Sequence, residues 1–256
     1  MNVKELFDLT GRVAIVTGGG AGLGLQIAEA LAESGANLVL CGRKKERCDQ
    51  AASRFAALGV KALSLACDVR NPGSIDDVVN RTIAEFGRLD ILVNNAGASW
   101  GAPVEIMPLE AWNKVIETNL TGTFLFSQAA GKHMIQQRRG KIINIASVAG
   151  LRGGPPDLPA IGYHSSKGGV ITFTKDLACK WAGRNIHVNA IAPGWFPTNM
   201  SAVVIERNRE ALRKRIPLGR FGNEQDLKGA AVFLASAASD FVTGHVLVVD
   251  GGQTAW

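Results

Sequence analysis

The sequence predicts a single α/β domain of the doubly wound type, with a seven-stranded parallel sheet and helices on both of its faces. Short apolar segments rich in Val, Ile and Leu recur seven times, and segments with helical periodicity separate them. No internal repeat, linker or change of composition divides the 256 residues. A glycine-rich turn follows the first apolar segment, as in domains of this class that bind dinucleotides. We therefore expect one dinucleotide-binding and catalytic domain over residues 1–256.

The composition argues against several classes of function. Hydrophobic residues make up 46% of the chain, but no run of eighteen apolar residues occurs, and the N-terminus lacks the apolar core of a signal peptide. The net charge of +6 comes from basic residues scattered among 22 acidic ones, so neither a membrane nor a nucleic acid is expected as a partner. No pair of cysteines has metal-binding spacing, which predicts reduced thiols in a cytoplasmic protein and no metal site. The four cysteines are Cys41, Cys48, Cys67 and Cys179.

The first strand is predicted over residues 11–17, and it runs into the segment T-G-G-G-A-G-L-G at 17–24. Helical periodicity follows as far as Gly35. Glycines let the backbone turn tightly and approach a ligand closely. The N-terminus of the following helix offers unpaired N–H groups and a positive dipole end to a phosphate. A purely structural turn is the alternative, but the order strand, glycine turn and helix favours a dinucleotide site.

The second strand, residues 37–41, ends where a dinucleotide-binding domain selects between NAD and NADP. A carboxylate there would bind the ribose hydroxyls and repel a 2′-phosphate. Gly42 occupies that place and Arg43 follows, and an arginine can hold a phosphate with two hydrogen bonds. The sequence therefore favours NADP. Ala21 leaves the glycine turn without a second basic residue, so NAD remains the alternative.

Two further strands are predicted before the middle of the chain. Residues 60–66 form the third strand, a helix over 72–86 follows with Pro72 in its first turn, and residues 90–93 form the fourth strand. That strand leads into N-N-A-G at 94–97, at the edge of the sheet where ligands bind in open α/β sheets. The two asparagines either support a cofactor-binding loop or only tie the sheet together.

The second half of the chain continues the alternation of helices and strands. A long helical region over 109–137 is interrupted at Asn119, which either satisfies local backbone groups or orders a water near the active site. Gly168 and Gly169 lie inside the helix over 163–182, which predicts close packing against another helix of this chain or of a second subunit. The remaining predicted elements are strands over 141–146, 186–192 and 245–249, a polar and basic lid around 195–219, and a helix over 225–235.

Tyr163 and Lys167 are the strongest candidates for catalysis. They are four residues apart on a predicted helix, so their side chains share one face. A cation beside a phenol favours the phenolate and lowers its pKa, and such a phenol can exchange a proton with a reacting oxygen. Two residues that merely share a helical face are the alternative, but Tyr163 is the only tyrosine in the chain. Ser147 precedes it by sixteen residues.

Taken together, these motifs resemble those of the short-chain dehydrogenase/reductase family across essentially the whole chain. The matching segments, in order, are T-G-G-G-A-G-L-G at 17–24, N-N-A-G at 94–97, Asn119, Ser147 with Y-x-x-x-K from Tyr163 to Lys167, and P-G-W-F-P-T at 193–198. The resemblance implies hydride transfer between a nicotinamide and a ketone or secondary alcohol. It also implies a homotetramer.

The resemblance assigns a role to each candidate residue. Tyr163 would be the general acid and base, and Lys167 would lower its pKa and hold the nicotinamide ribose. Ser147 would hydrogen-bond the substrate oxygen, and Asn119 would hold a water that relays protons to solvent. Asp68 would touch the adenine, Asn95 would support the cofactor loop, and Ile191 and Thr198 would flank the nicotinamide amide. The expected cofactor-binding set is Gly18, Gly20, Gly22, Leu23, Gly24, Arg43, Asp68, Val69, Asn95, Ala96, Gly97, Pro193, Gly194 and Thr198, with Tyr163 and Lys167.

The spacing of Ser147 and Tyr163 departs from the family, in which about thirteen residues is usual. The additional residues fall in the turn-rich segment 152–157, which reshapes one wall of the substrate pocket. Within the family, the segments around 7–20, 147–150 and 193–198 resemble gluconate 5-dehydrogenases, which act on sugar acids and polyols. They also resemble 3-oxoacyl-carrier-protein reductases, which act on thioesters. A dinucleotide-binding regulatory protein without chemistry is a further alternative.

Overall fold

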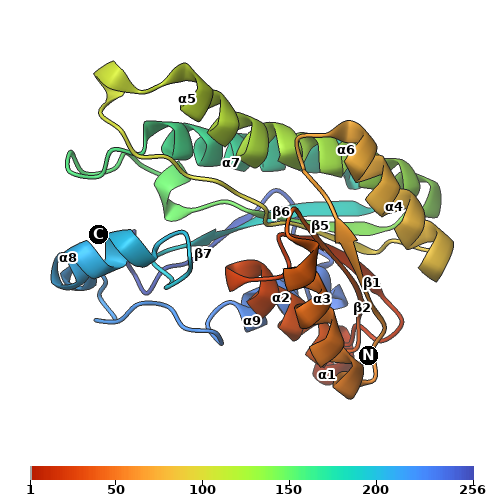
Figure 1. Cartoon of the computed structure of the whole chain (residues 1–256). Coiled ribbons are helices and arrows are strands. Elements are labelled where there is room, and N and C mark those ends of the chain that lie inside the picture. The colour runs from red at the N-terminus through yellow and green to blue at the C-terminus, as the bar shows by residue number, and fades with distance from the viewer. Residues whose placement is uncertain (1) are drawn as a thin grey trace.

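The computed structural model describes residues 2–256 and has a seven-stranded sheet in the order β3-β2-β1-β4-β5-β6-β7, in which every neighbouring pair is parallel. Helices cover both faces of the sheet (Figure 1). The predicted fold class is confirmed. The strands are β1 (Val13–Thr17), β2 (Asn37–Gly42), β3 (Ala62–Ala66), β4 (Ile91–Asn94), β5 (Gly140–Ile145), β6 (Ile186–Pro193) and β7 (Val246–Val249).

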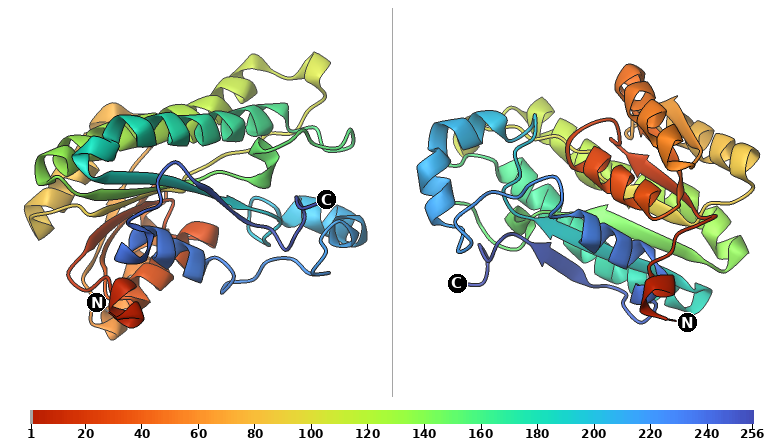
Figure 2. Two further views of the ribbon diagram at one scale, coloured as in Figure 1. Left: turned by 180° about the vertical axis from the view of Figure 1, so that it is seen from behind. Right: turned by 90° about the horizontal axis from the view of Figure 1, so that it is seen from below.

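The helices lie in two layers, and two views from other sides show the sheet between them (Figure 2). One layer contains α2 (Gly22–Glu33), α3 (Lys45–Phe55) and α9 (Lys228–Ala235), and the other contains α4 (Pro72–Phe86), α5 (Leu109–Ile116), α6 (Gly122–Gln137) and α7 (Ile161–Trp181). The short α1 (Val3–Leu6) lies near the N-terminus, and α8 (Ala202–Lys214) lies at one end of the molecule, beside the C-terminus. Within residues 2–256, no helix is long and apolar enough to cross a membrane.

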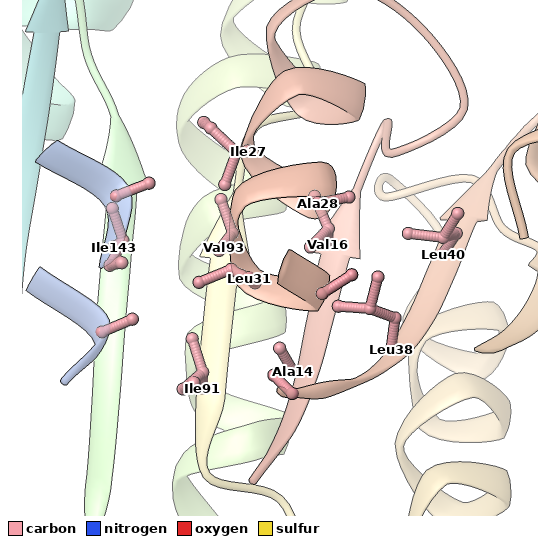
Figure 3. Packing of buried hydrophobic residues seen from close by; sticks show 14 of the residues in the cluster. Ala14, Val16, Ile27, Ala28, Leu31, Leu38, Leu40, Ile91, Val93 and Ile143 are labelled. Carbon is pink, nitrogen blue, oxygen red and sulfur yellow. The ribbon is translucent and has the colours of Figure 1, made fainter. Parts of the chain in front are cut away.

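The core of the first layer is built by alternation along the strands. Ala14 and Val16 of β1 face α2, where Ile27 and Leu31 pack against them, as Figure 3 shows. Ile15, between them in sequence, faces the other layer and joins the residues that α4 and α6 bury. Because parallel strands are buried on both faces, these segments are continuously apolar and give the strong signal that predicted them.

The order of the strands changes direction between β1 and β4, which leaves a crevice at the carboxyl ends of the strands. Thr17, Asn94, Ile145 and Pro193 end their strands at this edge. The residues that follow them include the glycine turn, Asn95 to Gly97, Ser147 and Gly194 to Thr198, so the fold brings these motifs to one side of the sheet.

The interruption predicted around Asn119 is a π-helical turn over Glu117–Thr121, which joins α5 to α6. Within α7, a Cβ on Gly169 would lie 2.8 Å from Leu120 of that turn. A Cβ on Gly150 would in turn lie 2.5 Å from the backbone of Lys167. The close packing predicted from Gly168 and Gly169 therefore involves elements of this chain, and the glycines let the part of α7 that carries Tyr163 and Lys167 approach them.

Two elements differ from the sequence prediction. The helix α3 over Lys45–Phe55 was not predicted, because its apolar positions are few and its sequence is rich in charge. The helix predicted over 225–235 begins only at Lys228 as α9, since residues 224–227 form turns in which the Asn223 side chain accepts a hydrogen bond from the backbone of Gln225.

Candidate active site

A cavity of about 1190 Å³ opens at the carboxyl edge of the sheet. Pockets for small ligands typically have volumes of about 300–1,000 Å³, so this one has room for a dinucleotide with a further small molecule. It brings together most of the predicted site. Its lining includes Gly18, Gly22, Leu23, Asn95, Ala96, Gly97, Ser147, Tyr163, Lys167, Pro193, Gly194 and Thr198.

Seven predicted residues lie outside this lining: Ile191 is fully buried in the core of the first layer, and four others pack just behind the lining. Gly20 lies against the backbone of Arg47, and Gly24 lies under the glycine turn. Val69 packs against Gly122, and Asn119 is 1% exposed behind Gly97. The other two residues, Arg43 and Asp68, lie at the ends of β2 and β3, where the adenosine end of a dinucleotide is expected.

The glycine turn is shaped for a ligand that needs close backbone approach. Gly18 and Gly22 have φ angles of +65° and +56°, which favour glycine. A Cβ on Gly24 would overlap the Asn95 amide and the Gly18 carbonyl. Asn95 Nδ2 donates to the Thr17 carbonyl at 2.8 Å and so holds the turn. With the N-terminus of α2 behind it, the turn fits the pyrophosphate of a dinucleotide.

The two neighbouring asparagines have different tasks. Asn94 Nδ2 donates to Ser127 Oγ at 3.0 Å and to Asn144 Oδ1 at 2.9 Å, so it ties β4 to α6 and β5. Asn95 braces the glycine turn. From the sequence, each asparagine could either support a cofactor-binding loop or tie the sheet together. In the structure, Asn94 ties the sheet together and Asn95 supports the glycine turn.

Tyr163 projects from the first turns of α7 into the cavity, next to Ser147. Ser147 begins the short helix η4 (Val148–Gly150), and its Oγ accepts a hydrogen bond of 3.1 Å from the Ala149 amide. The pKa of the Tyr163 phenol is raised by burial, whereas the sequence led us to expect that Lys167 lowers it; the neighbouring Ser147 hydroxyl partly opposes the effect of burial. The hydroxyl groups of Ser147 and Tyr163 therefore meet at one point of the cavity, where a substrate oxygen can contact both.

Lys167 is 4% exposed, and burial lowers the pKa of its ammonium to about 8. Its Nζ donates to the Ile145 carbonyl oxygen at 2.5 Å and lies 5.7 Å from the centre of the Tyr163 ring. The shared face predicted from the sequence is confirmed. The ammonium lies one helical turn from the phenol and also reaches the cavity wall, where it could hold ribose hydroxyls.

The Asn119 side chain is tied to the protein on both sides. Its Oδ1 accepts from the Ala98 amide at 2.7 Å, and its Nδ2 donates to the Ala98 carbonyl and to Ser166 Oγ, both at 2.9 Å. Ser166 Oγ donates to the Tyr163 carbonyl at 2.8 Å. This chain of bonds links the π-helical turn, the loop after β4 and the start of α7, so Asn119 fixes the position of Tyr163.

At the adenosine end, a second arginine accompanies the predicted one. Arg43 lies close enough to Asp68 to contribute to the low pKa of that carboxyl, about 2, which is caused mainly by its hydrogen bonds from Arg70. Arg47, in the first turns of α3, lines the cavity next to the glycine turn. The sequence prediction singled out only Arg43 as a phosphate ligand and found no second basic residue in the glycine turn itself, where Ala21 stands.

Several cavity residues carry no motif in the sequence. His164 follows Tyr163, and its Nδ1 lies 2.9 Å from the Ala160 carbonyl oxygen. Gln253 and Trp256 reach the cavity from the C-terminal segment. The predicted lid is largely α8, kinked at Asn208, and it lines the cavity with residues that include Val204, Arg207 and Leu212.

Comparison with known proteins agrees with this geometry. A family model described as "Enoyl-(Acyl carrier protein) reductase" matches residues 18–254. The chain is 42% identical to a gluconate 5-dehydrogenase of Gluconobacter oxydans (strain 621H) over 256 residues, which are 99% of each chain. It is also 39% identical to a 3-oxoacyl-[acyl-carrier-protein] reductase of Thermotoga maritima, over 95% of this chain and 98% of the relative.

Solved structures with the same fold include a short-chain type dehydrogenase/reductase from Mycobacterium marinum, with a TM-score of 0.96, 37% identity and 99% of each chain covered. A gluconate 5-dehydrogenase from Burkholderia cenocepacia J2315, in complex with NADP and tartrate, superposes over 100% of each chain with a TM-score of 0.94 and 39% identity.

Proposed function

Because the chain belongs to the short-chain dehydrogenase/reductase family, we propose that it is an NADP-preferring oxidoreductase that interconverts a ketone and a secondary alcohol of a sugar acid. The observation that carries the proposal is the meeting of Ser147, Tyr163 and Lys167 at the inner end of a cavity that begins at the glycine turn. Such a site serves proton exchange at an oxygen beside a bound dinucleotide.

The chemistry assigned to each side chain follows from its position. A nicotinamide supplies or accepts the hydride when it is bound. During reduction, the protonated Tyr163 donates its proton to the carbonyl oxygen, and the Ser147 hydroxyl donates a hydrogen bond to the same oxygen as negative charge develops there. The Lys167 ammonium stabilises the phenolate that remains. Asn119 acts through Ser166 and positions Tyr163.

The choice of a sugar acid rests on relatives and on charge. The Gluconobacter relative is a gluconate 5-dehydrogenase, and the Burkholderia relative binds tartrate, a dicarboxylate, together with NADP. Five basic side chains line the cavity and only one acidic side chain, Asp157, does so within residues 2–256. The basic side chains are Arg47, Arg152, Lys167, Arg207 and Arg215.

A second candidate is the reduction of a 3-oxoacyl thioester, which the Thermotoga relative and the apolar residues of α8 favour. A dinucleotide-binding protein without chemistry is disfavoured, since Asn119, Ser147, Tyr163 and Lys167 are all present.

One assay separates these functions. We expect the purified protein to oxidise NADPH in the presence of 5-ketogluconate, and to do so more efficiently than with NADH. Turnover of an acetoacetyl thioester in place of 5-ketogluconate would select the second candidate. Tight NADPH binding without turnover of either substrate would contradict the sugar-acid proposal.

We expect Arg43 and Arg47 to select NADP over NAD. Arg43→Ala and Arg47→Ala should each weaken NADPH binding by about 10- to 100-fold, because a charged hydrogen bond to a phosphate is lost, which contributes about 1.5–3 kcal/mol. NADH binding should change by less than about threefold, as it lacks the 2′-phosphate. Fluorescence titration with both nucleotides measures the two affinities. Lys61→Ala, an exposed change in the same half of the molecule, is the control. Equal losses for NADPH and NADH would contradict the assignment.

The quaternary structure and location follow as further parts of the proposal. Phe124 of α6 and Phe173 of α7 pack edge to face, and Phe124 remains 44% exposed. The strand β7 pairs only with β6 at one end of the sheet and includes the exposed Val248. A homotetramer would cover both surfaces, and light scattering after size exclusion tests it. The four cysteines are free, which suits the reducing cytoplasm.

A further inference from the structure

The segment that lengthens the interval between Ser147 and Tyr163 forms one wall of the cavity and contacts the C-terminal segment. We name residues 152–157 the inserted loop. The Arg152 Nη2 donates to the Gln253 carbonyl oxygen at 3.1 Å, a contact between residues 101 positions apart. In the middle of the loop, Gly154 packs on His164, and a Cβ on this glycine would lie 2.7 Å from His164 Nε2. The inserted loop is therefore held at two points beside the catalytic residues.

The C-terminal segment that Arg152 contacts is itself fixed to the cofactor side of the cavity. Asp250 Oδ2 accepts hydrogen bonds from the Thr254 amide at 2.8 Å and from Thr254 Oγ1 at 2.7 Å. Gly194 packs against Asp250, where a Cβ would lie 2.8 Å away. Arg152 is thus placed, through Gln253, relative to the segment that is expected to flank the nicotinamide.

Most N–H groups of the Arg152 guanidinium have no acceptor within the described residues. An arginine carries five N–H groups, and the one hydrogen bond of its side chain within residues 2–256 goes to the Gln253 carbonyl. No carboxylate of the described chain forms an ion pair with it, although it lines the cavity. Beside it, Gln253 is 8% exposed and its Oε1 has no hydrogen-bond partner among the described residues. A buried polar atom without a partner normally indicates a missing ligand or water.

We propose that Arg152 binds the carboxylate of the substrate. This inference rests on the proposed function and names the residue that would select acidic substrates. The planar guanidinium matches a carboxylate with two parallel hydrogen bonds. Arg207 and Arg215 also line the cavity, but they belong to α8 and the segment after it, and neither has a side-chain hydrogen bond within the described residues that fixes it. Of these three arginines, Arg152 is the one with a side-chain hydrogen bond to another element within the described residues.

The test measures binding without turnover. The NADPH-loaded enzyme is titrated calorimetrically with D-gluconate and with D-glucitol, a neutral polyol of the same chain length. We expect Arg152→Gln to weaken gluconate binding at least tenfold, about 1.4 kcal/mol, and to leave glucitol binding unchanged. Arg152→Lys retains one donor for the Gln253 carbonyl but cannot donate two parallel hydrogen bonds to a carboxylate. It should therefore give an intermediate loss of gluconate affinity. Arg184→Gln removes an exposed arginine away from the cavity and should change neither affinity.

Three results would overturn the inference. They are equal gluconate affinity in the wild type and Arg152→Gln, equal losses for gluconate and glucitol in that variant, and a wild type that binds gluconate no better than glucitol. Unchanged glucitol binding and an unchanged melting temperature of Arg152→Gln show that the loop keeps its fold. Failure of the proposed function would be seen in a different measurement. The wild type would then not oxidise NADPH with 5-ketogluconate, even if its binding of gluconate depended on Arg152.

Discussion

Replacing Tyr163 with phenylalanine should lower kcat by about 10²- to 10⁴-fold, the range that a positioned proton donor contributes. The ring keeps its place on α7, and Lys167 keeps its hydrogen bond to the Ile145 carbonyl, so the cavity retains its shape. NADPH affinity should therefore change by less than about threefold. Steady-state NADPH oxidation and a fluorescence titration measure the two quantities on the same preparation.

The same variant allows a direct observation of the phenol. Tyr163 is the only tyrosine in the chain, so the tyrosinate absorbance of the wild type reports this group alone. Burial raises the pKa of Tyr163 in the free protein, so tyrosinate should appear only above the usual range near pH 10, and Tyr163→Phe should abolish the signal. Turnover that survives in Tyr163→Phe at more than a tenth of the wild-type rate would show that another group donates the proton.

The sequence did not predict that Arg47 lies beside the glycine turn, and the reason is physical. The strands and the long helices gave strong periodic signals, because each of them buries a continuous face. The helix α3 buries only Cys48, Ala51 and Phe55, and its remaining positions are mostly polar or charged. Its pattern is therefore weak, and with it the position of Arg47 beside the glycine turn was missed.

The proximity of Tyr163 and Lys167 was predictable because it depends only on their spacing along one helix. Tyr163 and Lys167 share a face of one helix, which sequence spacing alone reveals. The contact of Arg152 with Gln253 joins two segments far apart in the chain, so no local sequence pattern predicts it. The sequence offered two tasks for Asn119 but could not identify its partners, because Ala98 and Ser166 lie on two other elements.

Replacing Lys167 with methionine should lower catalytic activity without lowering the stability of the folded protein. The ammonium is almost fully buried, and burial lowers its pKa from 10.5 to about 8. A difference of one pKa unit corresponds to about 1.36 kcal/mol, so keeping this charge in the folded protein costs about 3 kcal/mol at neutral pH. Methionine fills a similar volume without charge, but it gives up the hydrogen bond of the ammonium to the Ile145 carbonyl, about 1.5–3 kcal/mol. The variant should therefore be as stable as the wild type or more stable by up to about 1.5 kcal/mol at pH 7, while kcat/KM falls by about 10²-fold or more.

The pH dependence of this stability difference shows whether it comes from removal of a buried charge or from better packing of methionine. Between pH 8 and 10.5 the unfolded wild type still binds the Lys167 proton, whereas the folded protein has released it. The stability of the wild type therefore rises with pH in this window, and the advantage of Lys167→Met shrinks to nothing or reverses. Urea unfolding at pH 7 and at pH 9.5 measures both differences, and Lys180→Met, an exposed residue paired with Asp176, should differ from the wild type by less than about 0.5 kcal/mol at either pH. A stability gain of the same size at both pH values would mean that methionine packs better than lysine at this position. It would also mean that burial of the ammonium does not destabilise the folded protein.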